Sequence, residues 1–312
     1  AGSIKSFADK RPGVVRAAMG DTTDDLLAAA DDALEGKVTI EAIRKLHQDT
    51  AAELGIRTDD VDALLHELQT LLTGISMLRE LTSRSRDYLV SFGERLSVRL
   101  MAGYLNSLPV RAEFRDAWDV GFVSDSNFMS ADLLPETWEN IRKHLGSYGA
   151  GKKGDGMPIP IVTGFIAKDA SGSITTLGRG GSDLTATIIG AALRAEEVQT
   201  WKDVDGILTT DPRIVKEAQT VPVATYDEVA ELAYFGAQVL HPRSMQPCLQ
   251  TGTPVRVKNS YNIEAPGTII VTNHQTTPFP VRAITSKKGV TLIDIVSTRM
   301  LGQHGFLAKV FE

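Results

Sequence analysis

One stretch sets the architecture of this chain: Thr175-Thr176-Leu177-Gly178-Arg179-Gly180-Gly181-Ser182-Asp183-Leu184-Thr185-Ala186. A β-rich run over residues 173–177 breaks into a glycine-rich turn, and an apolar helix is expected over residues 184–193. Glycines let the backbone approach a ligand closely. The start of a helix offers free N–H groups and a positive dipole end to an anion. The pattern therefore predicts an anion-binding strand–turn–helix unit.

The side chains of this turn carry both signs of charge. Arg179 offers a guanidinium fork that suits a carboxylate or a phosphate, and Asp183 can hold a cation or an ammonium group. Neighbouring groups of opposite charge suit a zwitterion, such as an amino acid, next to a phosphate. A tight turn with a solvated arginine and an aspartate favoured by the helix dipole explains the same residues and stays open.

Composition bounds the class of protein. The chain has 312 residues, of which 42% are hydrophobic, so it can bury a large core. Its net charge of −6 argues against a nucleic-acid surface or a polybasic membrane contact. It lacks an apolar run long enough to span a bilayer, and its single cysteine, Cys248, excludes an internal disulfide. We expect a soluble protein from a reducing compartment, with no nucleic-acid or membrane partner.

The first third of the chain reads as helical. After an apolar stretch at Val14-Val15, a helix is expected over residues 25–34, and residues 39–105 read as an almost wholly helical insertion. Apolar residues there recur at the spacing of one buried helix face: Val61, Leu64, Leu65, Leu68, Leu71 and Leu72. Thr39 is the expected N-cap of the first helix in this insertion.

Beyond residue 107 the pattern becomes α/β. Short β runs are expected at residues 109–111, 159–166, 198–200, 254–257 and 268–271. Helices fall between them, and a capping box at Thr225-Tyr226-Asp227-Glu228 opens one that runs to about Ala237. This alternation predicts a three-layer αβα sandwich with a mainly parallel sheet. The first domain is expected over residues 1–275, followed over residues 276–312 by a linker, a strand (290–296) and the start of a helix (305–312).

Two further segments carry chemistry. Trp201-Lys202-Asp203-Val204-Asp205-Gly206 continues to Thr210-Asp211-Pro212-Arg213 and follows a strand, at the edge of the sheet where ligands gather. Its aspartates suit ribose hydroxyls and its arginine a polyphosphate, although a turn rich in aspartate explains the same residues. Ser91-Phe92-Gly93-Glu94 places a carboxylate beside a glycine within the helical region. Taken alone, this glutamate reads as solvated.

Two further features of the sequence resemble binding motifs but do not predict a binding site. Gly146-Ser147-Tyr148-Gly149-Ala150-Gly151-Lys152-Lys153 is close to a P-loop, but it lacks the final hydroxyl residue and follows a helix (137–145), so a loop is expected. The histidines show no metal-ligand spacing, and no metal-binding residue is predicted; His241, before Pro242, reads as structural. The absence of a legible nucleophile–base pair fits direct phosphoryl transfer.

Taken together, these segments resemble the aspartokinases of the amino acid kinase family, and most closely the plant monofunctional, lysine-sensitive type. The resemblance rests on Gly178–Asp183, Trp201–Gly206, Thr210–Arg213 and Phe235-Gly236-Ala237-Gln238-Val239-Leu240-His241-Pro242, and extends over residues 12–312. It implies phosphorylation of the side-chain carboxylate of L-aspartate by ATP with Mg²⁺, giving 4-phospho-L-aspartate. That reaction opens the route to lysine, threonine and methionine.

The resemblance also implies roles for single residues. Arg179 and Asp183 match the catalytic positions, and the substrate-binding positions are Thr23, Glu94, Arg179, Ser182 and Asp183. In this scheme Arg179 binds a substrate carboxylate, while Asp183 and Glu94 hold the ammonium group. The nucleotide-binding positions are Lys202, Asp203, Gly206, Asp211, Arg213 and Gln238.

The end of the chain resembles the start of an ACT regulatory domain. Ile295-Val296-Ser297-Thr298-Arg299-Met300-Leu301-Gly302 carries this resemblance. The implied effector positions are Met300, Gly302, Gly305, Phe306 and Leu307. The implied effector is lysine, with S-adenosylmethionine as a second effector, and the implied assembly is a homodimer through ACT domains. A plastid stroma is expected for a plant or algal source, and otherwise the cytoplasm.

Three departures from the family stand out. The family's first strand ends in Lys-Phe-Gly-Gly, a motif that is absent from this chain, and Ala17 and Asp21 replace an expected serine and lysine. The ACT region also stops at Glu312. We therefore expect either that further segments belong to the molecule or that catalysis is impaired, and intact mass distinguishes the two.

Three alternatives remain. A glutamate or acetylglutamate kinase would share the fold, and a substrate panel separates it. A non-catalytic relative that binds nucleotide or amino acid in a regulatory or assembly role is favoured by the departures, and ATP binding without turnover would support it. A dinucleotide oxidoreductase would need a Gly-x-Gly-x-x-Gly motif after an early strand, which this sequence lacks.

Overall fold

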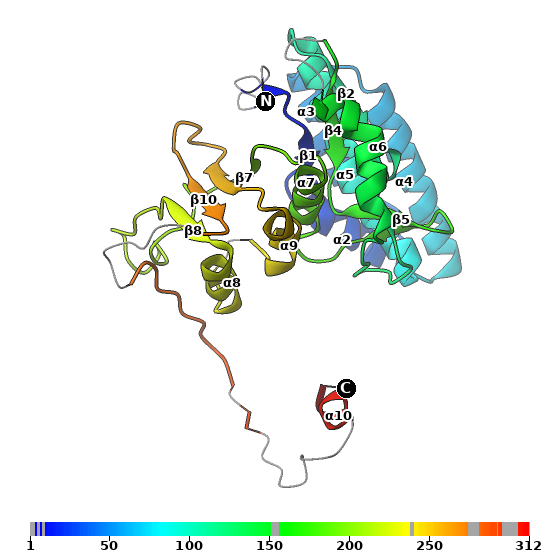
Figure 1. Cartoon of the computed structure of the whole chain (residues 1–312). Coiled ribbons are helices and arrows are strands. Elements are labelled where there is room, and N and C mark those ends of the chain that lie inside the picture. Colours follow the sequence, from blue (N-terminus) through cyan, green and yellow to red (C-terminus); the bar gives the residue numbers. More distant parts are fainter. Residues whose placement is uncertain are drawn as a thin grey trace.

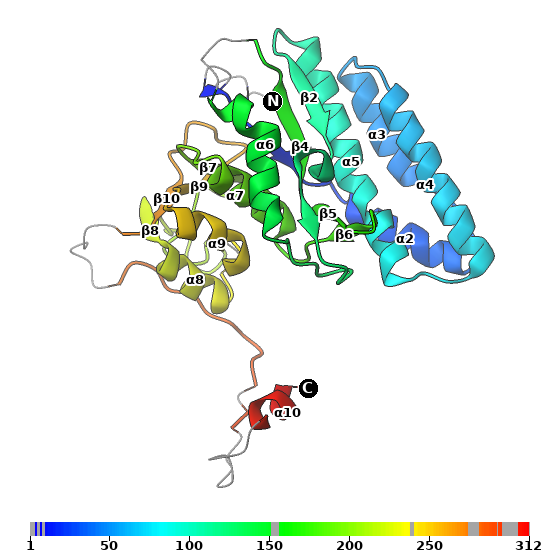
Figure 2. The ribbon, with the colours of Figure 1, turned by 45° about the vertical axis from the view of Figure 1, so that its right-hand side comes forward.

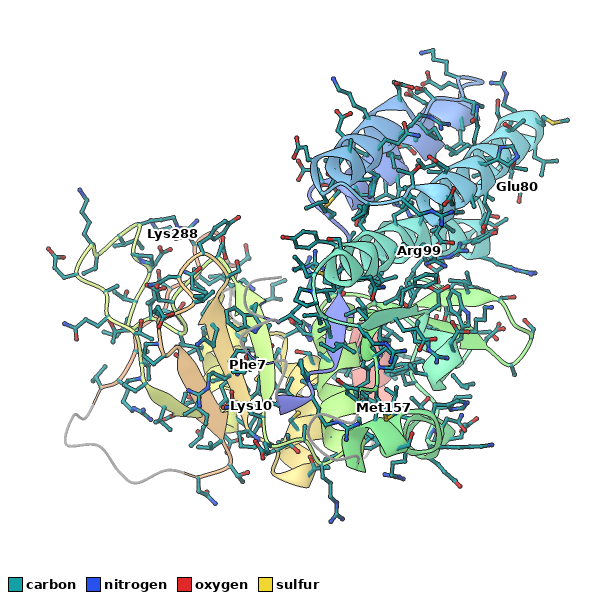
Figure 3. All side chains as sticks on the ribbon, turned by 90° about the horizontal axis from the view of Figure 1, so that it is seen from above. Phe7, Lys10, Glu80, Arg99, Met157 and Lys288 are labelled. Carbon is teal, nitrogen blue, oxygen red and sulfur yellow. The ribbon has the colours of Figure 1, made fainter. Side chains whose placement is uncertain are left out.

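The computed structural model describes residues 4, 7, 10–150, 156–237, 240–273, 281–291, 293, 294 and 305–311. In Figure 1 a helical layer and a first sheet lie on one side of the molecule, and a second sheet with its own helices lies on the other. Figure 3 shows the same division from above, with Arg99 in the helical layer and Lys288 in the second part. Phe7 and Lys10 lie between the two parts, and the Phe7 ring meets Trp201 edge-on.

The helical layer comprises α2 (Thr22–Leu34), α3 (Glu41–Glu53), α4 (Asp59–Leu78) and α5 (Ser83–Ser107). The predicted apolar face of α4 is buried against α2 and α5, apart from Leu71, which is half-buried. α2 begins one turn before the predicted start. The predicted N-cap was wrong: α3 is capped at Ile40, and Thr39 accepts only a long contact of 3.5 Å from the Glu41 amide.

The first sheet is parallel and has the strand order β1-β4-β2, with β1 (Val14–Arg16), β4 (Ile159–Thr163) and β2 (Ala112–Arg115). Val14 lies opposite Ile161, and Phe114 pairs with the same residue from the other side. α5 covers one face through an apolar cluster that includes Val98 and Leu105. α6 (Glu136–Ala150) and α7 (Gly181–Ala192) belong to the apolar core that includes Val15 and Val162, on the other face.

A small sheet beside it has the order β3-β5-β6, with β3 (Val123–Ser124), β5 (Ile166–Asp169) and β6 (Ile174–Thr176). The second large sheet has the order β7-β9-β10-β8, with β7 (Val198–Lys202), β9 (Val255–Asn259), β10 (Thr268–Val271) and β8 (Val223–Thr225). α8 (Tyr226–Tyr234) and α9 (Pro242–Thr251) pack with it, and α7 contacts α9, β7 and β1, so it joins the two halves (Figure 2).

Most of the predicted elements form, with shifted boundaries. The capping box at Thr225 is confirmed, but its helix ends at Tyr234. β2 begins three residues after its predicted start, and the run at 159–166 divides into β4 and β5. The predicted loop at 146–153 was wrong over its first part, because α6 continues to Ala150; residues 151–155 lie outside the described ranges.

The C-terminal predictions are only partly within the described chain. Residues 290, 291, 293 and 294 do not have strand geometry, which contradicts the predicted strand at 290–296 for these positions. The remaining residues of that segment, residues 276–280 of the predicted linker and residues 274 and 275 before it lie outside the description. A final short helix, α10 (Phe306–Phe311), lies apart from the sheets in Figures 1 and 2. No helix in the described ranges combines the length and hydropathy that a membrane span requires.

Candidate active site

The glycine-rich turn joins β6 to α7 by close packing that only glycine permits. Gly178 and Gly180 have φ angles of 70° and 75°, in the left-handed region that disfavours other residues. A Cβ on Gly180 would lie 2.8 Å from the His241 Cβ, and one on Gly181 would lie 2.8 Å from the Phe165 ring. No described side chain caps α7. The Gly181 amide donates to the Gly178 carbonyl at 3.1 Å, which leaves the first-turn amides of Ser182 and Asp183 available to an anion.

Two charged groups of the turn differ in their surroundings. The Arg179 side chain is exposed at the apex of the turn. Asp183, in the first turn of α7, lies 3.5 Å from the Lys202 ammonium at the end of β7, and both side chains are roughly a quarter exposed. Sequence reasoning assigned this pair to different ligands, so the ion pair places the predicted amino-acid and nucleotide positions next to each other.

Glu94 is a buried glutamate whose carboxyl group is only partly hydrogen-bonded. It is 4% exposed, one carboxylate oxygen accepts a hydrogen bond of 3.3 Å from the Ala18 amide, and the other has no partner among the described residues. Burial raises the pKa of this carboxyl from 4.5 to about 8. The reading of Glu94 as a solvated helical residue was therefore wrong. At neutral pH this carboxyl is therefore mostly protonated, and a cationic ligand group placed at its free oxygen would favour the ionised form.

Glycines bring α5 and α7 to the carboxyl ends of the parallel strands. A Cβ on Gly93 would lie 2.8 Å from the Ala18 Cβ, so Gly93 lets α5 approach the chain just after β1. The amide of Gly164, just after β4, donates to the Arg16 carbonyl at 2.9 Å. Gly164 also packs against Ser182 at the start of α7, because a Cβ on Gly164 would lie only 2.7 Å from the Ser182 Oγ. Glu94 and the start of α7 thus face the same edge of the first sheet, where open α/β sheets bind ligands.

The remaining predicted substrate position, Thr23, lies half-buried in the first turn of α2. Its neighbour Thr22 is buried and donates to the Met19 carbonyl, which fixes the turn between β1 and α2. Ala17 is exposed at the end of β1 and carries no hydroxyl group.

The predicted nucleotide residues follow β7. Gly206 has a φ of 126°, and a Cβ there would lie 2.6 Å from the Thr268 Oγ1, which accepts from the Ile207 amide. Asp203 is exposed beside this turn. The Arg213 side chain is 82% exposed, and its Nε and Nη2 both donate to the Asp211 carboxylate within one tight turn. This contact lowers the pKa of the Asp211 carboxyl. Without a ligand, these two residues form the aspartate-rich turn that the pattern left open.

Several predicted positions are not described. Gln238, Met300 and Gly302 lie outside the described ranges. Gly305 has a φ of 81° before Phe306, the first residue of α10, and the side chain of Leu307 is not described. The effector positions are therefore not assembled into a described pocket.

Sequence reasoning missed two charged residues that hold the glycine-rich turn. Asp87 on α5 accepts hydrogen bonds from Thr176, and Arg243 on α9 donates to the Leu177 carbonyl at 2.9 Å. Arg243 also donates to the carbonyl of Ala131 and to Asp132. Neither residue stands out locally, because each partner segment is remote in the sequence. His241 is structural as predicted, since its Nδ1 accepts from the Arg243 amide and caps α9.

Comparison with known proteins supplies the wider context. Residues 1–259 match the model of the amino acid kinase family. The chain is 51% identical to chloroplastic aspartokinase 2 of Arabidopsis thaliana over 99% of its own length and 57% of that protein. It is 32% identical to the lysine-sensitive aspartokinase 3 of Escherichia coli, over 99% of this chain and 68% of that one.

A solved structure shows the same architecture. Escherichia coli aspartokinase III in complex with aspartate and ADP superimposes with a TM-score of 0.76 at 29% identity, over 90% of this chain and 62% of that chain. The present chain spans a little more than half the length of the Arabidopsis relative.

Proposed function

The chain belongs to the amino acid kinase family and, within it, to the aspartokinases; from that premise we propose that the protein phosphorylates the side-chain carboxylate of L-aspartate with ATP. An oxygen of that carboxylate attacks the γ-phosphorus, the bond to the β-phosphate oxygen breaks, and 4-phospho-L-aspartate and ADP leave. The attack on phosphorus requires no proton transfer, which agrees with a site built from charges rather than from a nucleophile–base pair.

One observation carries this proposal: the free, buried oxygen of Glu94 at the sheet edge that also receives the start of α7. In the proposed complex, Glu94 holds the ammonium group of aspartate and Arg179 binds a carboxylate. Ser182 and Thr23 contribute hydroxyl groups. Asp183 releases part of its contact with Lys202 to the substrate, and Lys202 turns toward the nucleotide phosphates.

The nucleotide is proposed to lie over the turn that follows β7. Asp203 and Gly206 would contact the ribose and phosphates, while Arg213 would exchange part of its pairing with Asp211 for a phosphate oxygen; Gln238 is the proposed contact near the adenine. Within the described ranges, no cluster of three or more His, Cys, Asp or Glu side chains could hold a metal ion. Mg²⁺ would accompany the ATP phosphates and neutralise part of their charge.

The finer points of function rest on the family. The proposed role is the first step toward lysine, threonine and methionine. The proposed effectors are lysine and S-adenosylmethionine, acting on a homodimer through ACT domains, to which Met300, Gly302, Gly305, Phe306 and Leu307 would contribute. The name of the E. coli relative, lysine-sensitive aspartokinase 3, supports the lysine effector. The chloroplastic relatives support a plastid location.

A second candidate is a binding-competent chain with impaired catalysis. The observation that favours it is the methyl side chain of Ala17 at the exposed end of β1, where the resemblance implies a serine hydroxyl. Calorimetric titration with L-aspartate and with Mg-ATP, alongside a coupled assay of ADP release, separates the two candidates. Binding with turnover supports the kinase, binding of either ligand without turnover supports the second candidate, and failure to bind either ligand contradicts both.

A further inference from the structure

Asp87 is a buried carboxylate that the proposed reaction does not use. It lies on α5, is 1% exposed and accepts three hydrogen bonds of 2.9 Å. One oxygen accepts from the amides of Met129 and Thr176, and the other accepts from the Thr176 hydroxyl. Since a buried carboxylate is stable only when its oxygens are paired, this arrangement is a specific contact between α5 and two remote segments.

Both partner segments belong to the support of the glycine-rich turn. Thr176 is the last residue of β6, two residues before Gly178. Met129 has a φ of 72°, and its carbonyl would lie 3.4 Å from a Cβ on Gly178. Asp87 therefore fixes the strand that enters the turn and also the backbone that lies against it.

The same helix carries Glu94. Seven residues separate it from Asp87, which is about two helical turns, so the two side chains project from the same side of α5. The rotation of α5 is fixed further along, because Arg95 pairs with Glu67 at 3.0 Å and Arg99 pairs with Asp116 at 3.3 Å. α5 and the turn are thus joined through Asp87.

We propose that Asp87 is a positioning residue of the amino-acid site: it sets the placement of Arg179 and Asp183 relative to the Glu94 carboxylate. This inference rests on the proposed function, because it assumes that these groups bind the two ends of one aspartate molecule. The proposed nucleotide contacts lie at the end of β7 and in the turn after it, on the second sheet. Lys202 is the one that also pairs with a residue of α7, Asp183, so Asp87 should affect ATP binding far less than aspartate binding.

The test compares ligand affinities of folded variants by calorimetry. Asp87→Ala removes all three acceptor contacts and is expected to weaken aspartate binding by about 10- to 100-fold, since small displacements in a preorganised site have effects of that order. ATP affinity is expected to change less than about threefold. Asp87→Asn should restore most of the aspartate affinity, because its amide oxygen accepts from both backbone N–H groups and its NH₂ donates to the Thr176 hydroxyl.

The hairpin formed by β5 and β6, which ends at Thr176, offers a matched control. Asp169, at the opposite end of β5, is 7% exposed and accepts from Ser126, Ser171 and Ser173. Asp169→Ala should lower thermal stability about as much as Asp87→Ala while leaving aspartate affinity unchanged. If Asp87→Ala fails to fold, Thr176→Val decides the matter, with aspartate binding weakened about threefold and ATP binding unchanged.

Two results overturn the inference. One is unchanged aspartate affinity in folded Asp87→Ala (or, if that variant does not fold, in Thr176→Val), and the other is an equal loss of aspartate and ATP affinity in the variant that is measured. Failure of the proposed function is visible separately, in the unmutated chain: if that chain does not bind aspartate, both the function and this inference fall.

Discussion

The carboxylates proposed to support the two ligand sites differ in burial between the two halves of the molecule. On the side of the first sheet, Asp87 and Glu94 are almost fully buried, the first with every oxygen paired and the second with one oxygen free. On the side of the second sheet, Asp211 pairs with an exposed arginine in the same turn. Burial keeps geometry fixed and makes an unpaired charge costly, whereas an exposed pair rearranges at little cost.

The difference indicates how the two proposed ligands are recognised. The amino-acid side is preorganised, so its residues should control aspartate affinity strongly. The nucleotide side exposes pairs that a polyphosphate can open, so single residues there should have small effects. Asp183 and Lys202 bridge the two sides, at 3.5 Å from each other.

The largest effect is expected for Arg179→Ala. Loss of a charge-assisted carboxylate contact should weaken aspartate binding by about 2–4 kcal/mol, or roughly 30- to 1000-fold, with ATP affinity nearly unchanged. Calorimetric titration with each ligand measures both values. Collapsed ATP affinity beside intact aspartate affinity would reverse the proposed assignment of the two sides.

Next in size is the pH dependence of aspartate affinity. Only the ionised Glu94 carboxylate attracts an ammonium group, and burial raises its pKa to about 8. The dissociation constant for aspartate should therefore fall by about tenfold from pH 6 to 7 and by about fivefold from pH 7 to 8. Titrations at several pH values measure the slope, and a flat profile would contradict the role of Glu94.

Glu94→Gln is the control for that profile. It should bind aspartate weakly and with little pH dependence over the same range.

The raised pKa of Glu94 also predicts a pH dependence of stability. In the native protein, the folded state holds a proton on Glu94 that the unfolded state releases above pH 4.5. Stability should consequently fall as pH rises from about 4.5 to 8, and this part of the decline should be absent in Glu94→Gln.

A smaller effect is expected for Arg243→Ala. The change leaves the buried Leu177 carbonyl and the carbonyl of Ala131 without this donor, which should lower the free energy of unfolding by about 1–3 kcal/mol and weaken aspartate binding severalfold. Arg256→Ala, which removes a pair with Glu197 on the second sheet, is the matched control. An equal loss of aspartate affinity in both variants would argue against a local effect on the turn.

The smallest effect on stability is expected for Arg213→Ala. Because its side chain is 82% exposed and its pairing among the described residues stays within its own turn, the free energy of unfolding should remain nearly unchanged. ATP affinity should fall by about three- to tenfold if the arginine contacts a phosphate. Thermal melts and ATP titrations measure the two quantities, and a large loss of stability would contradict the proposed contrast between the halves.

The elements that could be predicted from sequence are those with strong local patterns. The α4 face, the capping box at Thr225 and the glycine-rich turn each depend on neighbouring residues, so the sequence carries their signal. β2 begins later than predicted because Asn106, on α5, accepts a hydrogen bond from the Ala112 amide and donates one to the Ala112 carbonyl. This contact from another element fixes where the strand begins.

The site was less predictable because its environment is tertiary. Gly93 looks like an ordinary helical glycine until α5 is seen to approach Ala18, and this approach is what buries Glu94. Asp87 and Thr176 are 89 residues apart, and Arg243 and Leu177 are 66 apart. Residue types at those positions carry no local signal for the contacts they make.

The central claim is that the first half recognises both charges of an amino acid, and titration with L-aspartate and with succinate at pH 8.5 tests it most directly. Succinate keeps both carboxylates but lacks the ammonium group that would face Glu94. The expected result is measurable aspartate binding with succinate weaker by at least about tenfold, and a difference that becomes much smaller in Glu94→Gln. Equal binding of the two ligands to the unmutated chain, or binding of neither, would contradict the account.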